Sequence, residues 1–161
     1  MFIMTATAIG SLMLGAGSEP PRVRADDVRL AALIEAGARR SSTLGSIVER
    51  LRSANVVVYV EFGRCDGHVV ACLGFVTWAT PFLYVRATVD PFEKPECTTV
   101  GLIAHELQHA SELDRSAVRT RAQFETFFAS HGRRGSAGYE TDAAAAAGIR
   151  VEHECQSASH R

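Results

Sequence analysis

Residues 97–113 read CTTVGLIAHELQHASEL, and we expect the sheet and the other helices to pack against this stretch. Its apolar side chains recur at helical spacing without an interrupting proline, which predicts an amphipathic helix. We expect the helix to begin at Thr98 or Thr99, because either hydroxyl can cap the first turn, and to end near Leu113. The expected buried face comprises Leu102, Ile103, Leu107, Ala110 and Leu113.

The same helix carries the motif His105-Glu106-Leu107-Gln108-His109. Residues four positions apart lie one above the other on a helix, so both imidazoles can bind one Zn²⁺ ion. The carboxylate of Glu106 projects beside that ion, where it can take a proton from a zinc-bound water. We therefore expect His105 and His109 to be ligands of one Zn²⁺ per chain and Glu106 to be a general base.

A catalytic zinc ion needs a third protein ligand and one open position. Positions 112 and 115 are Glu and Arg, so the extended HExxHxxGxxH pattern is absent. Glu140 is the preferred third ligand, because on a last helix beginning near Tyr139 it would lie on a narrow stripe of small residues. Such a stripe allows that helix to approach the motif helix closely. The stripe continues through Ala144, Ala147, Val151 and Cys155.

Three other acidic residues remain as alternative ligands. Glu112 lies on the same helix as His109, and three ligands from one straight helix crowd poorly around a tetrahedral ion, so we expect it beside the site or at the surface. Asp142 points away from the stripe of Glu140. Glu125 falls among the phenylalanines of residues 124–128 and can face either way.

A stabiliser of the transition state is expected opposite the metal ion, and Tyr139, His131 and Arg133 are the candidates. Each has a structural alternative: Tyr139 can pack at the start of a helix, His131 can interact with a helix C-terminus, and Arg133 can be solvated. The phenylalanines of residues 124–128 have the spacing of one helix face. That spacing favours a core contact over a substrate pocket.

Residues 97–113 resemble the active-site helix of the zincin metallopeptidases, and a glutamate ligand on a later helix resembles their gluzincin branch. The segment Tyr139-Glu140-Thr141-Asp142-Ala143 departs from the fuller Glu-x-x-x-Asp ending of some gluzincins. The resemblance implies peptide-bond hydrolysis, with an extended peptide along the strand nearest the helix, here residues 82–89. The alternative function is a non-catalytic structural or interaction module stabilised by zinc.

The other segments predict an α+β fold with a short, mainly antiparallel sheet packed against the motif helix and further helices. The β-branched run Val56–Phe62 is a strand, and two more strands complete a three-stranded meander. A loop is expected at residues 131–138. The remaining expected elements are helices at 26–37, 43–52, 116–130 and from 139 onward, and strands at 69–77 and 82–89.

The composition fits one globular domain. Of 161 residues, 47% are hydrophobic and 22% charged, which is enough apolar material for a core. Seventeen basic and eighteen acidic residues give a formal charge of -1, so there is no electrostatic reason to bind nucleic acid. A peptide or protein substrate is the expected partner.

The N-terminus predicts export. Residues 1–18 are uncharged and apolar and end in small residues, which is typical of a signal peptide, although a basic start is missing. We expect a domain at residues 19–161 in the periplasm or outside the cell, with no stable membrane partner once the leader is removed. A membrane anchor formed by residues 1–18 is the alternative.

The four cysteines are an even number and fit disulfide formation in an exported protein. We expect one bridge among Cys65, Cys72 and Cys97. The position of Cys155 near the C-terminus leaves its pairing open.

Overall fold

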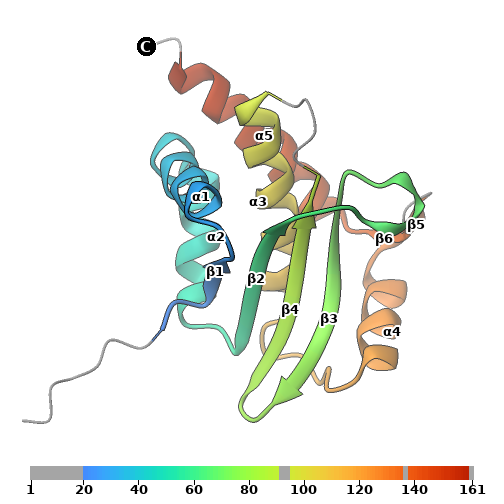
Figure 1. Cartoon of the computed structure of the whole chain (residues 1–161). Coiled ribbons are helices and arrows are strands. Elements are labelled where there is room, and N and C mark those ends of the chain that lie inside the picture. The colour runs from blue at the N-terminus through green and yellow to red at the C-terminus, as the bar shows by residue number, and fades with distance from the viewer. Residues whose placement is uncertain (1–19, 91–94, 136–137, 160–161) are drawn as a thin grey trace, which may run out of the picture.

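The computed structural model describes residues 20–90, 95–135 and 138–159. Within these residues the fold is mixed α+β, with five α-helices, a four-stranded sheet and a two-stranded hairpin. Helix α3 (Glu96–Glu112) lies against the sheet, and α5 (Asp142–Ser159) lies along α3 (Figure 1). Helix α4 (Arg121–His131) lies beside the edge strand β3 (Ala71–Ala79). The predicted α+β class is confirmed, whereas the predicted leader at residues 1–18 lies outside the described residues.

The main sheet contains β1 (Val23–Ala25), β2 (Val56–Phe62), β3 (Ala71–Ala79) and β4 (Phe82–Val89) in the order β1-β2-β4-β3. β2 is parallel to both β1 and β4, and β3 is antiparallel to β4. The predicted antiparallel three-stranded meander is therefore wrong, and β1 was not anticipated. This order places the mostly buried β2 and β4 inside the sheet, with β1 at one edge and the more exposed β3 at the other.

The first two helices, α1 (Val28–Arg40) and α2 (Ser42–Arg52), lie close to their predicted ranges. Asp27 and Ser41 cap them by accepting hydrogen bonds from backbone amides of the first turn. Glu154 of α5 also accepts hydrogen bonds at the start of α2, from Ser41 Oγ at 2.6 Å and Thr43 Oγ1 at 2.8 Å. A short 3₁₀ helix, η1 (Asp66–His68), follows β2.

The motif helix α3 (Glu96–Glu112) begins earlier than predicted, directly after Pro95, and neither expected threonine caps it through its side chain. Thr98 Oγ1 instead donates to Glu152 Oε1 of α5 at 2.7 Å. The next helix, α4 (Arg121–His131), begins later than predicted because Thr120 is its cap. Arg115 adopts a positive φ of 58°, so the chain turns between these two helices.

The largest local difference from the predicted elements lies before the last helix. Two paired strands, β5 (Arg133–Gly135) and β6 (Gly138–Glu140), lie where a loop was expected, and α5 (Asp142–Ser159) begins only after them. Gly138 has φ of 132°, which glycine adopts without steric cost. Glu140 therefore belongs to a strand, and its predicted place on the last helix is wrong.

Helices α3 and α5 pack at unusually close range. A Cβ atom on Gly101 of α3 would lie 2.9 Å from the carbonyl oxygen of Gly148 on α5, so only glycine fits there. The predicted stripe of small residues on α5 is buried, which confirms the expected close approach of the two helices. The buried residues of this stripe are Ala144, Ala147, Val151 and Cys155.

Two disulfides link the chain, Cys65–Cys72 and Cys97–Cys155. The first confirms the expected bridge among the three earlier cysteines. The second joins the start of α3 to the end of α5, a pairing that the sequence left open. Both bridges are compatible with an exported protein. In the described part of the chain, no helix has the length and apolar character needed to cross a membrane.

We predict that Gly101→Ala destabilises the protein by about 1–3 kcal/mol, because the added methyl group forces α5 away from α3. Thermal unfolding followed by circular dichroism measures this loss. Gly45→Ala in α2 is the control, since its Cβ would meet one carbonyl oxygen, that of Ala38, at 3.3 Å. An equal loss in both variants would contradict the close packing of α3 and α5.

We also predict that the two disulfides contribute unequally to stability. They close loops with sequence separations of 58 and 7 residues. On chain entropy alone, removing Cys97–Cys155 should cost about 4 kcal/mol and removing Cys65–Cys72 about 2 kcal/mol. Denaturant titration of the two double Cys→Ser variants tests the order, and a larger loss for the Cys65–Cys72 pair would contradict it.

Candidate metal centre

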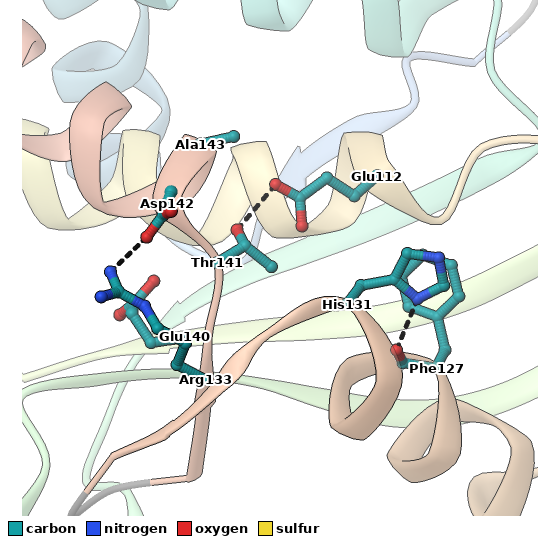
Figure 2. A pocket seen from close by; sticks show the side chains of 8 residues that line it. All are labelled: Glu112, Phe127, His131, Arg133, Glu140, Thr141, Asp142 and Ala143. Carbon is teal, nitrogen blue, oxygen red and sulfur yellow. Dashed lines mark hydrogen bonds and ion pairs between the residues drawn. The ribbon is translucent and has the colours of Figure 1, made fainter.

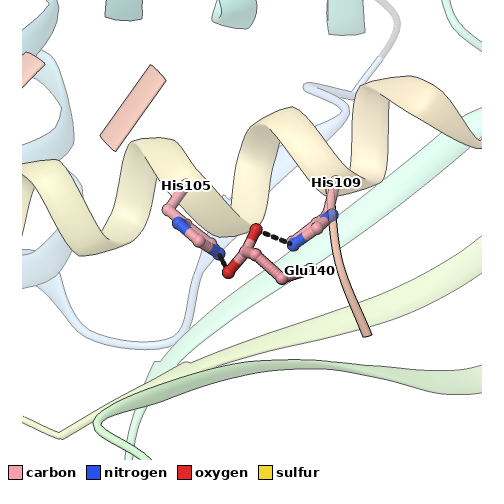
Figure 3. A group of neighbouring side chains, drawn as sticks. All are labelled: His105, His109 and Glu140. Atoms are coloured by element: carbon pink, nitrogen blue, oxygen red, sulfur yellow. Dashed lines mark ion pairs between the residues drawn. The ribbon is translucent and has the colours of Figure 1, made fainter. Parts of the chain in front are cut away.

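Three predicted ligands lie together at one point of the fold. His105 and His109 project from the same face of α3, one turn apart, and Glu140 reaches them from the end of β6 (Figure 3). His105 Nε2 lies 3.1 Å from Glu140 Oε2, and His109 Nε2 lies 3.4 Å from Glu140 Oε1. One ligand atom from each residue falls within 4.8 Å of the others.

The hairpin and α5 together place Glu140. In the hairpin, Glu140 pairs with Arg133, and the backbone of Gly132 approaches so closely that a Cβ there would lie 3.0 Å from the Glu140 carbonyl oxygen. The next residue, Thr141, accepts a hydrogen bond from the Ala144 amide and so begins α5. Glu140 is thus held between a strand pair and a capped helix.

The chemistry of this group fits a metal ion. Two imidazoles and a carboxylate are a ligand set that zinc and related divalent metals accept. Glu140 Oε1 is buried, and beyond the 3.4 Å approach of His109 Nε2 it has no hydrogen-bond partner among the described residues. A buried carboxylate oxygen with so weak a partner costs free energy, and a cation bound between the three side chains would remove that cost. The group can therefore hold a metal ion.

Burial is the main influence on the protonation equilibria of His105, Glu106 and Glu140. Burial, with a smaller contribution from His109, lowers the pKa of His105 to about 4, so its imidazole is neutral and able to act as a ligand. Burial is the main cause that raises the pKa of Glu140. Burial also raises the pKa of Glu106 to about 8, partly opposed by His109. A bound dication would shift both carboxyl groups towards their ionised forms.

His109 and Glu112 form a pair in which each side chain affects the other. Burial by itself lowers the pKa of His109, but the contact with Glu112 and the charge of Glu106 outweigh it, and the pKa is raised. Burial by itself raises the pKa of Glu112, but its contacts with His109 and Thr141 outweigh it, and the pKa is lowered. Glu112 is therefore ionised at neutral pH.

The three ligands face a cleft of about 490 Å³. Glu106 lines the same cleft although it is only 3% exposed, so the expected general base lies beside the ligands. One wall is the segment Val69–Leu73, which leads into β3. β3 is thus the sheet edge beside the site, and the strand at residues 82–89 is not, because β2 and β3 pair with it on both sides. Further apolar lining residues are Leu102, Phe124, Phe128 and Tyr139.

Two of these apolar residues change the sequence interpretation. Phe124 and Phe128 are buried in the core, as expected, yet each also lines the cleft. Leu102 was expected on the buried face of the motif helix, and it is half-buried at the cleft. The cleft borders the core, so one side chain can pack in the core and also line the cleft.

The candidate stabilisers separate into two groups. Tyr139 lines the cleft, whereas His131 and Arg133 line a second hollow of about 500 Å³, to which Glu140 also contributes (Figure 2). The His131 ring stacks on Phe127, and His131 Nδ1 lies 2.8 Å from the Phe127 carbonyl oxygen, which matches the helix C-terminal alternative. Tyr139 is therefore the candidate stabiliser that lines the same cleft as His105, His109 and Glu140.

The alternative ligands lie outside the metal group. Asp142 forms an ion pair with Arg133 at the surface. Glu125 is exposed at the rim of the cleft. Glu112 lies beside His109 on the side of Nδ1, away from Glu140. Thr141 was missed altogether, although a threonine directly before the Asp142–Ala147 run is a recognisable helix-start signal.

A search of protein-family models, of curated proteins and of solved structures finds no match to this chain. The site is therefore interpreted from its own geometry and chemistry.

We predict about one zinc ion per chain in the purified protein and marked loss of zinc in Glu140→Ala and His109→Ala, because each removes one of three ligands. Asp142→Ala is the matched control, since this neighbouring carboxylate is paired with Arg133 and should leave zinc content unchanged. Elemental analysis after dialysis measures the zinc content of the parent and of each variant. Equal zinc retention in Glu140→Ala and Asp142→Ala would exclude Glu140 as a ligand.

Proposed function

We propose that this protein is a zinc-dependent metallopeptidase of the zincin type, in which His105, His109 and Glu140 bind the metal. The observation that carries the proposal is the convergence of these three side chains and Glu106 on one open cleft. Three protein ligands beside an accessible cavity are typical of catalytic zinc sites, which keep a coordination position for water or substrate.

A structural zinc module is the alternative, and it needs a fourth protein ligand. The four cysteines and Glu112 are the residues that would most readily supply a fourth ligand, and all of them make other contacts. All four cysteines form disulfides, and Glu112 contacts His109 Nδ1 and Thr141. The described residues therefore favour an open site over a closed one.

The chain's own groups have distinct roles in peptide hydrolysis. When bound, zinc would polarise the scissile carbonyl and lower the pKa of a water molecule. Glu106 would accept the proton of the attacking water and donate it to the leaving amine. Tyr139, which also lines the cleft, would donate a hydrogen bond to the carbonyl oxygen as negative charge develops on it.

The edge strand β3 supports binding of an extended peptide. β3 pairs with β4 along one side, and its first residues, Ala71–Leu73, line the cleft. Further along, Arg121 of α4 donates a hydrogen bond to the Phe75 carbonyl oxygen, so α4 covers that part of the strand. An extended peptide could add to the open stretch by backbone hydrogen bonds and would lie beside Glu106.

An exported peptidase is consistent with the two disulfides. Disulfides persist in oxidising compartments, and here they link the start of α3 to α5 and close the turn before β3. We propose that the enzyme acts on peptides or proteins in the periplasm or outside the cell.

We predict that Glu106→Gln keeps zinc but lowers peptide hydrolysis at least about 100-fold, because the amide cannot accept the proton. Zinc content and cleavage of a mixture of unstructured peptides, followed by mass spectrometry, measure the two properties on the same sample. A chelator should abolish cleavage by the parent and added zinc should restore it. Undiminished cleavage by Glu106→Gln would remove the general-base role.

A further inference from the structure

Glu112 makes contacts that a surface glutamate would not make. Its side chain is 18% exposed and lies beside His109, on the side of Nδ1. Glu112 Oε1 accepts a hydrogen bond from Thr141 Oγ1 at 2.8 Å and a longer one from Gln108 Nε2 at 3.5 Å. Glu112 Oε2 lies 3.4 Å from His109 Nδ1. One carboxylate therefore contacts both α3 and the residue that follows Glu140.

Thr141 transmits this contact to the other ligand segment. Its side chain is buried, and its hydroxyl both donates to Glu112 and accepts from the Ala144 amide at 3.2 Å. The hydroxyl therefore caps α5 and fixes the backbone directly after Glu140. Figure 2 shows the bond from Thr141 to Glu112. Together with the bond from the Ala144 amide, it constrains where β6 ends and so where the Glu140 carboxylate can lie.

Two carboxylates face the His109 ring, Glu112 at Nδ1 and Glu140 at Nε2, each at 3.4 Å. An ionised carboxylate only accepts hydrogen bonds, so with a metal ion on Nε2, Glu112 favours the form of the imidazole with its proton on Nδ1. His109 Nε2 then carries a lone pair towards Glu140, where the metal would bind. The ring packs edge-on against Phe128 with centroids 5.1 Å apart, which further limits its rotation.

We propose that Glu112 is a positioning residue that couples the two ligand segments of the metal centre, holding the tautomer of His109 and, through Thr141, the place of Glu140. Outer carboxylates of this kind orient metal-binding histidines and strengthen metal affinity. The inference rests on metal binding by the proposed ligands and does not depend on peptide hydrolysis.

The first test is zinc affinity, measured by competition with a chromophoric chelator. Glu112→Ala should bind zinc about 10- to 100-fold more weakly than the parent. Glu154→Gln is the matched control, because Glu154 also accepts hydroxyl hydrogen bonds at a helix start but contacts Ser41 and Thr43. It should lower thermal stability without changing zinc affinity. Parent-like affinity in Glu112→Ala would overturn the proposal.

Variants of Thr141 separate positioning from packing. Thr141→Ser keeps the hydroxyl and should keep zinc affinity close to that of the parent. Thr141→Val has nearly the same shape but can neither donate to Glu112 nor cap α5, so its zinc affinity should fall. Equal affinity of the Ser and Val variants would show that the hydroxyl does not position Glu140, and would overturn the coupling.

The second test reads the tautomer of His109 in metal-free Glu140→Ala, which lacks the carboxylate that faces Nε2, by ¹⁵N NMR of the imidazoles at alkaline pH. His109 of this variant should carry its proton on Nδ1. With Glu112→Gln added, the amide can give its oxygen to Thr141 and present its NH₂ to Nδ1, which should move the proton to Nε2. His105, which makes no hydrogen bond with Glu112 among the described residues and is affected by its charge, should keep its tautomer. An unchanged His109 tautomer on adding Glu112→Gln would overturn the proposal.

The outcomes distinguish this role from the proposed activity. Zinc binding by the parent without peptide cleavage would remove the peptidase function and leave the role of Glu112 standing. Absence of zinc binding by the parent would overturn the metal centre and the role of Glu112 with it. Cleavage by a zinc-loaded parent, combined with parent-like zinc affinity in Glu112→Ala, would remove only the role of Glu112.

Discussion

The backbones of α3 and α5 lie glycine against glycine, and the placement of the His105, His109 and Glu140 group depends on this contact. A Cβ at Gly101 would come within 2.9 Å of the Gly148 carbonyl oxygen, and a Cβ at Gly148 within 3.2 Å of the His105 Cβ. A larger residue at either position would therefore move α5 and, with it, the hairpin that ends in Glu140. The Cys97–Cys155 disulfide ties the far ends of the same two helices. Ligand geometry is thus a consequence of helix packing.

Several ionisable groups are buried around His105 and His109, and their burial costs free energy unless opposite charges or hydrogen bonds compensate it. Glu106 and Glu140 both have raised pKa values, mainly because of burial, and beyond the 3.4 Å approach of His109 Nε2 one oxygen of Glu140 has no hydrogen-bond partner in the described part of the chain. Glu112 differs, because His109 and Thr141 satisfy its carboxylate. A divalent cation would compensate the two carboxylates that face the cleft, while Glu112 holds the surrounding side chains.

Local patterns predicted the parts of the site that lie within one element. His105, Glu106 and His109 share a helix whose periodicity is visible in residues 97–113, so their relative placement needed no tertiary information. The prediction of Glu140 as a ligand rested on a position on the last helix, and that position is wrong. The stripe of small residues belongs to α5, as expected, but Glu140 lies before that helix on β6. It reaches the histidines because the hairpin leads directly into a helix that packs on α3.

The sequence by itself determined the α+β composition, the buried strand Val56–Phe62, the motif helix and the residue types that can bind a metal, since each follows from short-range periodicity and side-chain chemistry. Only the tertiary structure decided the parallel pairing of β2 with β4, the edge position of β3, the partner of Cys155 and the contact of Glu112 with Thr141. Each of these joins residues far apart in the chain. Strand order and helix contacts depend on how whole faces are buried against one another, and a local pattern carries no information on that choice.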